Sequence, residues 1–240
     1  VPSKIVRYSL LTQKSERYSW NFVNGEVQQY SKDTPLGNLQ VWELRDQPAI
    51  TEEEDMPSYG AIGTILYISS VPSWQEIVQW YYNIARTKTR SSLDVRTKMN
   101  ELFPPGKQYT KQEIIEGVYH FITTNIRYSN VPFRQSGVVP QTARDVLVTR
   151  IGDCKDVATL CISMLAERGV TAYHALVRTN SSPLRKQPLP SIPFDHDIVY
   201  TELDGKPLFM DLTAENVPLY SLPFGDLEAL CLVIRPGEST

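Results

Sequence analysis

The sequence predicts an α+β fold in which a helix that begins at a cysteine packs against an antiparallel sheet. Helical patterns fill the middle of the chain, and a capped helix begins at Cys154. Apolar, strand-like runs separated by turns follow, and they carry His196 and Asp211. Helices followed by strands in this way favour an α+β layout, with a cleft between the helix and the sheet. The first 72 residues are different, because their patterns predict strands.

The N-terminal segment predicts a β domain. Its strand-like runs are rich in Val, Tyr, Trp and Ile, which favour strands. They cover residues 4–11, 18–22, 26–30, 39–44 and 63–69. Asn24-Gly25 separates two of these runs and suggests a hairpin between them. We place the domain boundary near Val71-Pro72, which gives a β domain at 1–72 and a second domain at 73–240.

Capping boxes mark the helices of the second domain. Ser73-Trp74-Gln75-Glu76 has a serine three residues before a glutamate, and an apolar stripe at helical spacing accompanies it. Thr110-Lys111-Gln112-Glu113 repeats the pattern at the start of a helix with its own apolar face. Thr142 begins a short helix just before the cysteine. We therefore expect helices on the N-terminal side of Cys154.

The helix at Cys154 begins with a third capping box. Asp153 is the expected N-cap, Asp156 closes the box, and Gly169 is the expected stop. Between them, Val157, Cys161, Met164, Leu165 and Arg168 recur at helical spacing. Cys154 is then the first helical residue, where free N–H groups and the positive helix end favour a thiolate, the reactive form of cysteine.

Two carboxylates oppose this effect. Asp153 and Asp156 lie next to Cys154 in the chain, and negative charge near the sulfur disfavours a thiolate. The sequence leaves open whether the helix end and a nearby histidine outweigh them. For Asp156 and its neighbour Lys155 we expect a mainly structural role, in capping and as local charge.

A histidine and an aspartate are expected to share one sheet face. His196 lies in an apolar stretch that predicts a strand, and Asp204-Gly205 after it signals a two-residue hairpin turn. With that turn, Ile198 faces Asp211 across the hairpin. Because side chains alternate along a strand, Asp211 lies diagonally opposite His196 on the same face. A one-residue shift of the pairing would move Asp211 to the other face.

The remaining cysteines and histidines are predicted to be structural. Cys161 follows Cys154 by one repeat of the helix face and is expected in the core. Cys231 lies in an apolar run typical of a buried strand. His174 is expected on a strand and His120 on a helix, both without a catalytic role. No cysteine spacing indicates a disulfide framework or a zinc site, so no metal or other cofactor is expected.

These motifs in this order resemble the transglutaminase-like superfamily of papain-like cysteine enzymes. The resemblance covers roughly 73–237, and it rests on 140–147, 152–156, 194–196 and 210–214. It is closest to bacterial, Bacteroides-type members, in which a β domain of unknown function precedes the core. One departure is that Phe209-Met210 stands where relatives often have a Trp just before the catalytic Asp.

The resemblance implies a papain-like core with a Cys154, His196 and Asp211 triad. Cys154 would attack a carbonyl carbon and form a thioester, His196 would transfer the proton, and Asp211 would orient the imidazole. The backbone N–H of Cys154 is a natural oxyanion donor. Gln135 is a candidate second donor only because it is an amide-bearing residue in the loop before the motif.

The reaction class stays open at this point. Water as the acceptor would make the protein a cysteine peptidase or amidase, and an amine would make it a transglutaminase. We place peptidase or amidase first, acyl transfer second, and a non-catalytic module that binds a peptide or glycan third. The intact Cys154, His196 and Asp211 argue against the third. The expected partner is a peptide or protein substrate.

Composition excludes several other functions. The net charge of −3 has no basic stripe, so nucleic-acid binding lacks electrostatic support. No apolar run is long enough to span a membrane, and no phosphate-binding or dinucleotide motif occurs. Residues 178–193 predict a long loop beside the cleft, able to gate it. The resemblance further implies an exported protein, periplasmic or at the cell surface. It also implies a natural chain longer than 1–240, with the β domain present only in part as a partial β-sandwich.

Overall fold

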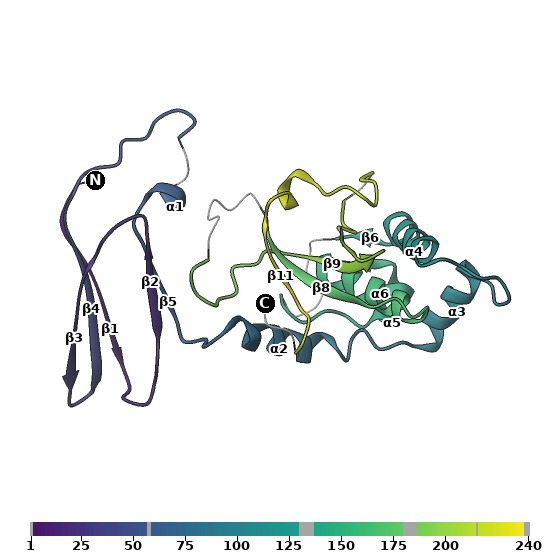
Figure 1. The fold of residues 1–240 in the computed structure, drawn as a ribbon, viewed down its shortest axis with the longest axis horizontal. Coiled ribbons are helices and arrows are strands. Elements are labelled where there is room, and N and C mark those ends of the chain that lie inside the picture. The colour runs from purple at the N-terminus through teal and green to yellow at the C-terminus, as the bar shows by residue number, and fades with distance from the viewer. Residues whose placement is uncertain (1, 57–58, 130–136, 180–186, 215, 238–240) are drawn as a thin grey trace. The chain divides into compact units, whose positions relative to one another are not determined.

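The computed structural model describes residues 2–56, 59–129, 137–179, 187–214 and 216–237 (Figure 1). Its contacts divide the chain into two compact units. The first consists of residues 2–74 together with 187–191, and the second contains the remaining described residues. Segment 187–191 thus groups with the N-terminal unit, where the Ser69 hydroxyl donates to the Pro190 carbonyl at 2.6 Å. The expected division into domains at 1–72 and 73–240 stays a prediction.

The N-terminal unit is built mainly from strands, as its composition predicts. One antiparallel sheet has the order β1-β4-β3, and a second sheet pairs β2 with β5. β4 is central, and its Val41 and Trp42 are buried. That these sheets belong to a β-sandwich stays a prediction. The elements are β1 (Ser3–Thr12), β2 (Ser19–Val23), β3 (Gln28–Thr34), β4 (Gly37–Gln47), α1 (Tyr59–Ile62) and β5 (Ile65–Ser69).

The hairpin predicted at Asn24-Gly25 is wrong. β2 pairs with β5, and β3 forms its hairpin with β4, where Thr34 faces Gly37. Asn24 has a positive φ of 61°, but Gly25 does not, and a type I′ turn needs positive φ at both positions. The Asn24 amide instead donates to the carbonyls of Ala61 and Gly63, so the turn leads the chain out of one sheet and into the other.

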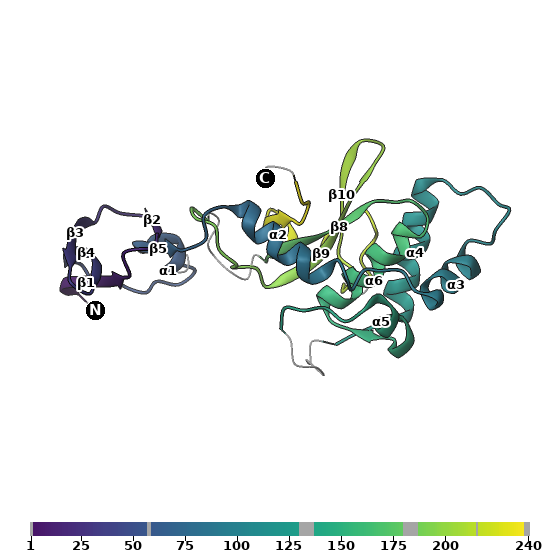
Figure 2. The same ribbon diagram turned by 90° about the horizontal axis from the view of Figure 1, so that it is seen from below.

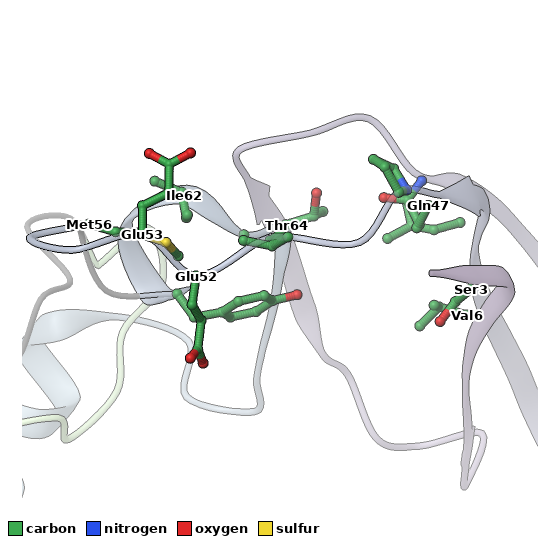
Figure 3. Close-up of a pocket in the computed structure, with 13 residues that line it drawn as sticks. Ser3, Val6, Gln47, Glu52, Glu53, Met56, Ile62 and Thr64 are labelled. Carbon is green, nitrogen blue, oxygen red and sulfur yellow. The ribbon is translucent and has the colours of Figure 1, made fainter. Parts of the chain in front are cut away.

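A cavity of about 830 Å³ lies in the N-terminal unit (Figure 3). β1, the end of β4 and the segment around α1 surround it. Its lining mixes apolar, hydroxyl and acidic side chains, among them Val6, Thr64, Glu52 and Glu53. Cys154, His196 and Asp211 belong to the other unit.

The second unit combines helices with a four-stranded antiparallel sheet, which confirms the α+β prediction (Figure 1). The sheet has the order β10-β9-β8-β11. Before the sheet come α2 (Trp74–Ala85), α3 (Leu93–Leu102), α4 (Lys111–Asn125), β6 (Arg127–Tyr128), α5 (Ala143–Thr149), β7 (Ile151–Gly152) and α6 (Cys154–Ala166). The sheet region contains β8 (Ala172–Arg178), β9 (His196–Leu203), β10 (Lys206–Met210), the 3₁₀ turn η1 (Phe224–Asp226) and β11 (Leu230–Val233).

Helix α6 is the centre of the main hydrophobic core. It packs against α4 and α5 and against β8 and β9 of the sheet. Leu160, Met164 and Leu165 of α6 are completely buried. The predicted capping boxes of α4 and α6 are both formed. None of the helices that the structure describes has the length and apolar character needed to span a membrane.

The turn between β9 and β10 forms as the sequence predicts (Figure 2). Asp204 and Gly205 have φ values of 52° and 73°, the positive angles of a type I′ turn. Leu203 pairs with Lys206 and Val199 with Met210. This register puts Asp211 beyond the end of β10 and opposite Ile198, on the face that also carries His196.

Candidate active site

Cys154 occupies the first turn of α6. The N-cap Asp153 is in extended conformation and accepts a hydrogen bond from the Asp156 N–H, while the Asp156 side chain accepts one from the Asp153 N–H. Cys154 is partly buried. The capping box therefore fixes the start of the helix and holds the sulfur at its positive end.

Asp156 also fastens the preceding segment to this helix. Its two carboxylate oxygens accept hydrogen bonds from the backbone N–H and the side-chain amide of Gln141, each at 2.7 Å. Lys155 is buried and forms an ion pair with Asp153. The structural roles expected for Asp156 and Lys155 agree with these contacts.

The structure brings His196 and Asp211 together. The Nε2 atom of His196 lies 3.2 Å from Oδ2 of Asp211. Asp211 is buried, and its other oxygen, Oδ1, accepts hydrogen bonds from the Thr213 N–H and hydroxyl at 2.8 and 2.7 Å. The carboxylate is thus held from one side while it holds the imidazole on the other.

Cys154 lies close enough to His196 to act on the charge of the imidazole. Since Nε2 faces Asp211, Nδ1 is the ring nitrogen left for the thiol. Burial disfavours the imidazolium, but the side-chain interactions with Asp211 and Cys154 and the charges of both groups outweigh it and raise the pKa of His196 to about 10. The site therefore favours a proton on the imidazole.

The pKa of Asp211 moves in the opposite direction. Burial alone would raise it, but the hydrogen bond and charge of His196, together with the two hydrogen bonds from Thr213, lower the pKa below its ordinary value. A carboxylate beside an imidazolium is the arrangement that orients a catalytic histidine.

Two tyrosines near the thiol were not predicted from the sequence. Tyr128 of β6 pairs with Gly152 of β7, two residues before Cys154. Burial, then the charges of Cys154, Asp153 and Asp211, raise its pKa to about 12. Tyr81 of α2 is buried, and burial, Asp197 and Cys154 raise its pKa as well. Both come from elements outside the cysteine and hairpin motifs, so no local pattern connects them to the site.

A second histidine–aspartate pair lies on the opposite face of β9. His174 Nδ1 is 2.9 Å from Oδ2 of Asp197, and the Tyr81 hydroxyl donates to the same oxygen at 2.8 Å. His174 and Asp197 are both buried. This agrees with the strand position and structural role expected for His174.

The other predicted residues lie away from the thiol or outside the description. Cys161 is buried in α6, and burial raises its pKa. Cys231 lies on β11, where burial and nearby carboxylates raise its pKa to about 12. All three cysteines are free thiols. Gln135 lies outside the described residues, and part of the predicted loop at 178–193 does too. The expectation that the site uses no metal or cofactor stays a prediction.

Comparison with known proteins gives one family and two solved structures. Residues 95–213 match the family model of a transglutaminase-like domain. A solved structure of a candidate protease from Parabacteroides distasonis aligns with a TM-score of 0.67 and 17% identity over 97% of this chain. A candidate cysteine protease from Cytophaga hutchinsonii aligns with a TM-score of 0.38 and 11% identity, over 88% of this chain and 72% of its own.

These similarities have defined limits. At 17% identity, the Parabacteroides protein shares the fold, and this chain spans 44% of its length. The Cytophaga alignment is too weak to support an argument. No curated protein matches the chain. The matched region 95–213 contains Cys154, His196 and Asp211.

Proposed function

We propose, because residues 95–213 match the family model of a transglutaminase-like domain, that this protein is a cysteine peptidase or amidase with Cys154, His196 and Asp211 as its catalytic triad. The expected substrate is a peptide or protein, and the bond broken is an amide. The location we propose is the periplasm or the cell surface.

One observation carries the proposal: His196 bridges a buried carboxylate and a thiol at a helix N-terminus. Its Nε2 is 3.2 Å from Oδ2 of Asp211, and Cys154 is near enough to help raise its pKa. The pKa of about 10 for His196 favours the imidazolium, and an imidazolium stabilises a neighbouring thiolate. By contrast, His174, which pairs with Asp197, is more deeply buried than His196.

The chemistry follows from these positions. The Cys154 sulfur attacks the carbonyl carbon, and His196 gives its proton to the leaving amine, which departs as the thioester forms. His196 then takes a proton from water, which attacks the thioester and releases the acid and the free thiol. An amine in place of water would give a new amide. Asp211 keeps the imidazole oriented throughout.

Two donors are available for the developing oxyanion. As the first residue of α6, Cys154 has a backbone N–H without an acceptor inside its own helix. Tyr128 is our candidate for the second donor, because the charge of Cys154 helps to raise the pKa of its hydroxyl. The side chain is 37% exposed, so a substrate can reach it from solvent. We expect Tyr128→Phe to lower turnover about a hundred- to a thousandfold, as loss of an oxyanion donor does. Turnover equal to that of the unaltered protein would remove Tyr128 from the mechanism.

The first test is thiol reactivity. We expect iodoacetamide at neutral pH to alkylate Cys154 before Cys161 or Cys231, since burial raises the pKa of both other thiols. Peptide mass spectrometry at short reaction times gives the order. Faster labelling of Cys161 or Cys231 would contradict the assignment of the nucleophile.

The second test identifies the reaction. The intact protein and Cys154→Ala are incubated with a peptide library, with and without an added primary amine. Cleavage without the amine supports a peptidase or amidase, whereas products that contain the amine indicate acyl transfer. Absence of turnover together with a slowly alkylated Cys154 would favour a non-catalytic binding module.

A further inference from the structure

A third carboxyl group lies beside the proposed triad. Asp226 ends the 3₁₀ turn η1 just before β11, and its backbone N–H donates to the Pro223 carbonyl. Although most aspartates are exposed, Asp226 is only 7% exposed. Neither the cysteine motif nor the β9–β10 hairpin contains it, so the mechanism above does not use it.

Asp226 faces the triad carboxylate. One oxygen of Asp226, one oxygen of Asp211 and a ring nitrogen of His196 all lie within 4.8 Å of one another. The other hydrogen-bonding positions of Asp211 are occupied, because Oδ1 accepts from Thr213 and Oδ2 faces His196. Oδ2 of Asp226 is buried and has no hydrogen-bond partner among the described residues.

A buried carboxylate oxygen without a donor is costly, and a second carboxylate beside it adds repulsion. A proton on one of the two carboxyls removes both costs, because the protonated group becomes a donor to the other. We propose that Asp226 is a positioning residue of the triad that shares a proton with Asp211, so that loss of this proton changes the charge acting on His196. This inference rests on the proposed function.

The surrounding charges agree with a shared proton. Burial, the charge of Asp211, an interaction with its side chain and the charge of Asp195 raise the pKa of Asp226, while His196 on β9 lowers it, and the net result is a pKa of about 6. Cys231 of β11 also lies within the electrostatic range of Asp226. Asp226 is therefore neutral in mild acid and ionised above pH 6.

Stability gives a readout that needs no substrate. The pKa of Asp226 is higher in the folded protein than the ordinary value of 3.8. The resulting stabilisation is full below pH 3.8 and is lost as pH rises through about 6. In Asp226→Asn, an amide that cannot ionise takes the place of the protonated carboxyl. We expect the melting temperature of the unaltered protein, measured relative to this variant, to fall by about 2–4 °C between pH 4.5 and pH 7.5.

The second readout reports on the triad itself. When Asp226 ionises, its charge stabilises the imidazolium of His196, which in turn stabilises a Cys154 thiolate. The iodoacetamide rate at Cys154 should therefore rise several-fold with an inflection near pH 6 in the unaltered protein, and Asp226→Asn should lack this inflection. Asp204→Asn is the matched control, because Asp204 is exposed in the β9–β10 turn and its positive φ suits asparagine.

Each outcome decides the inference. Loss of both pH effects in Asp226→Asn, with both kept in Asp204→Asn, supports it. A melting-temperature difference that does not change with pH overturns it, and so does an unchanged alkylation profile. A melting temperature that chelation by EDTA lowers only while Asp226 is present would show that a cation, not a proton, joins the carboxyls.

Two further measurements keep the test independent. If Asp226→Asn does not fold, carbon NMR of aspartate carboxyls in the unaltered protein must show Asp226 titrating near pH 6, and titration near pH 4 overturns the inference. If Cys154 is not the fastest-alkylated cysteine, the proposed function fails, while the melting measurement still tests the shared proton.

Discussion

At the scale of single residues, the proposed site depends on how the hydrogen bonds of Asp211 are divided between Thr213 and His196. Thr213 occupies one oxygen of Asp211, so the other is directed at His196. The same contacts that hold His196 also keep it protonated, with a pKa of about 10. Orientation and charge therefore have one cause, and a change in Asp211 should alter both.

We expect Asp211→Asn to lower turnover by roughly ten- to a thousandfold while the protein keeps its fold. The amide keeps the size of the side chain but removes the charge that stabilises the imidazolium. The equivalent change costs about ten-thousandfold in a serine protease, and a thiol needs less help from its base. The assay is turnover of a substrate from the peptide screen beside circular dichroism. Full activity would show that another group orients His196, and loss of the fold would make Asp211 chiefly structural.

His196 should also make stability depend on pH. Its pKa rises from 6.5 to about 10 on folding. The stabilisation this provides is complete below pH 6.5 and is lost as pH rises through about 10. The urea concentration at the midpoint of unfolding should therefore be higher for the unaltered protein than for His196→Gln, and this difference should shrink between pH 7 and pH 10.5. His120 is exposed on α4, so the difference in midpoint between the unaltered protein and His120→Gln should not change with pH. A constant difference for His196→Gln would contradict the paired imidazolium.

At the scale of elements, local signals predicted well and long-range pairing did not. The boxes at Thr110 and Asp153 are complete within four residues, so the sequence contains all their partners. The Asp204-Gly205 turn is equally local and fixed the position of Asp211. Asn24-Gly25 failed because the strand that pairs with β2 lies some forty residues away. Helix α3 was missed, since only Val95 and Met99 of its apolar residues are buried.

The same contrast explains what was found at the site. Cys154, His196 and Asp211 belong to short motifs, whereas Tyr81 reaches Asp197 from 116 positions away. Tyr128 and Asp226 also come from separate elements. Tyrosine is a common residue in strands and aspartate in turns, so only the tertiary contacts of these two residues connect them to the site.

The cap of α6 should matter for reactivity as well as for stability. Asp153→Ala and Thr142→Ala each remove an N-cap, and each should cost about 1 kcal/mol in the free energy of unfolding. Only α6 begins at the reactive thiol, so Asp153→Ala alone should change the alkylation rate of Cys154. Urea unfolding and alkylation kinetics measure the two effects. Equal alkylation rates in both variants would show that this cap does not influence the thiol.

At the scale of the whole molecule, the two units differ in how much apolar surface they bury. Among the described residues of the N-terminal unit, the deeply buried apolar ones are Val41 and Trp42, and β1 leaves Ile5, Val6 and Tyr8 about half exposed. In the second unit, α4, α5, α6 and the sheet share one large core. Local stability follows such differences in burial.

Hydrogen exchange on the full chain should therefore separate the units. We expect amides of β1 to exchange orders of magnitude faster than those of α4 and α6, because opening β1 exposes little additional apolar surface. Mass spectrometry of peptides after timed labelling gives the rates. Equal protection in both units would contradict this expectation and indicate one cooperative structure.

Two histidine–aspartate pairs lie on opposite faces of β9, so the gene is sensitive to the loss of a single codon in this strand. His196 and Asp197 are neighbours, yet one contacts Asp211 and the other contacts His174. Losing a single codon between Asp197 and the turn, with the reading frame kept, would carry the imidazole to the face that Asp197 occupies now. The spacing of fifteen positions between His196 and Asp211 is thus inherited information in itself, and a deletion there would separate the imidazole from Asp211.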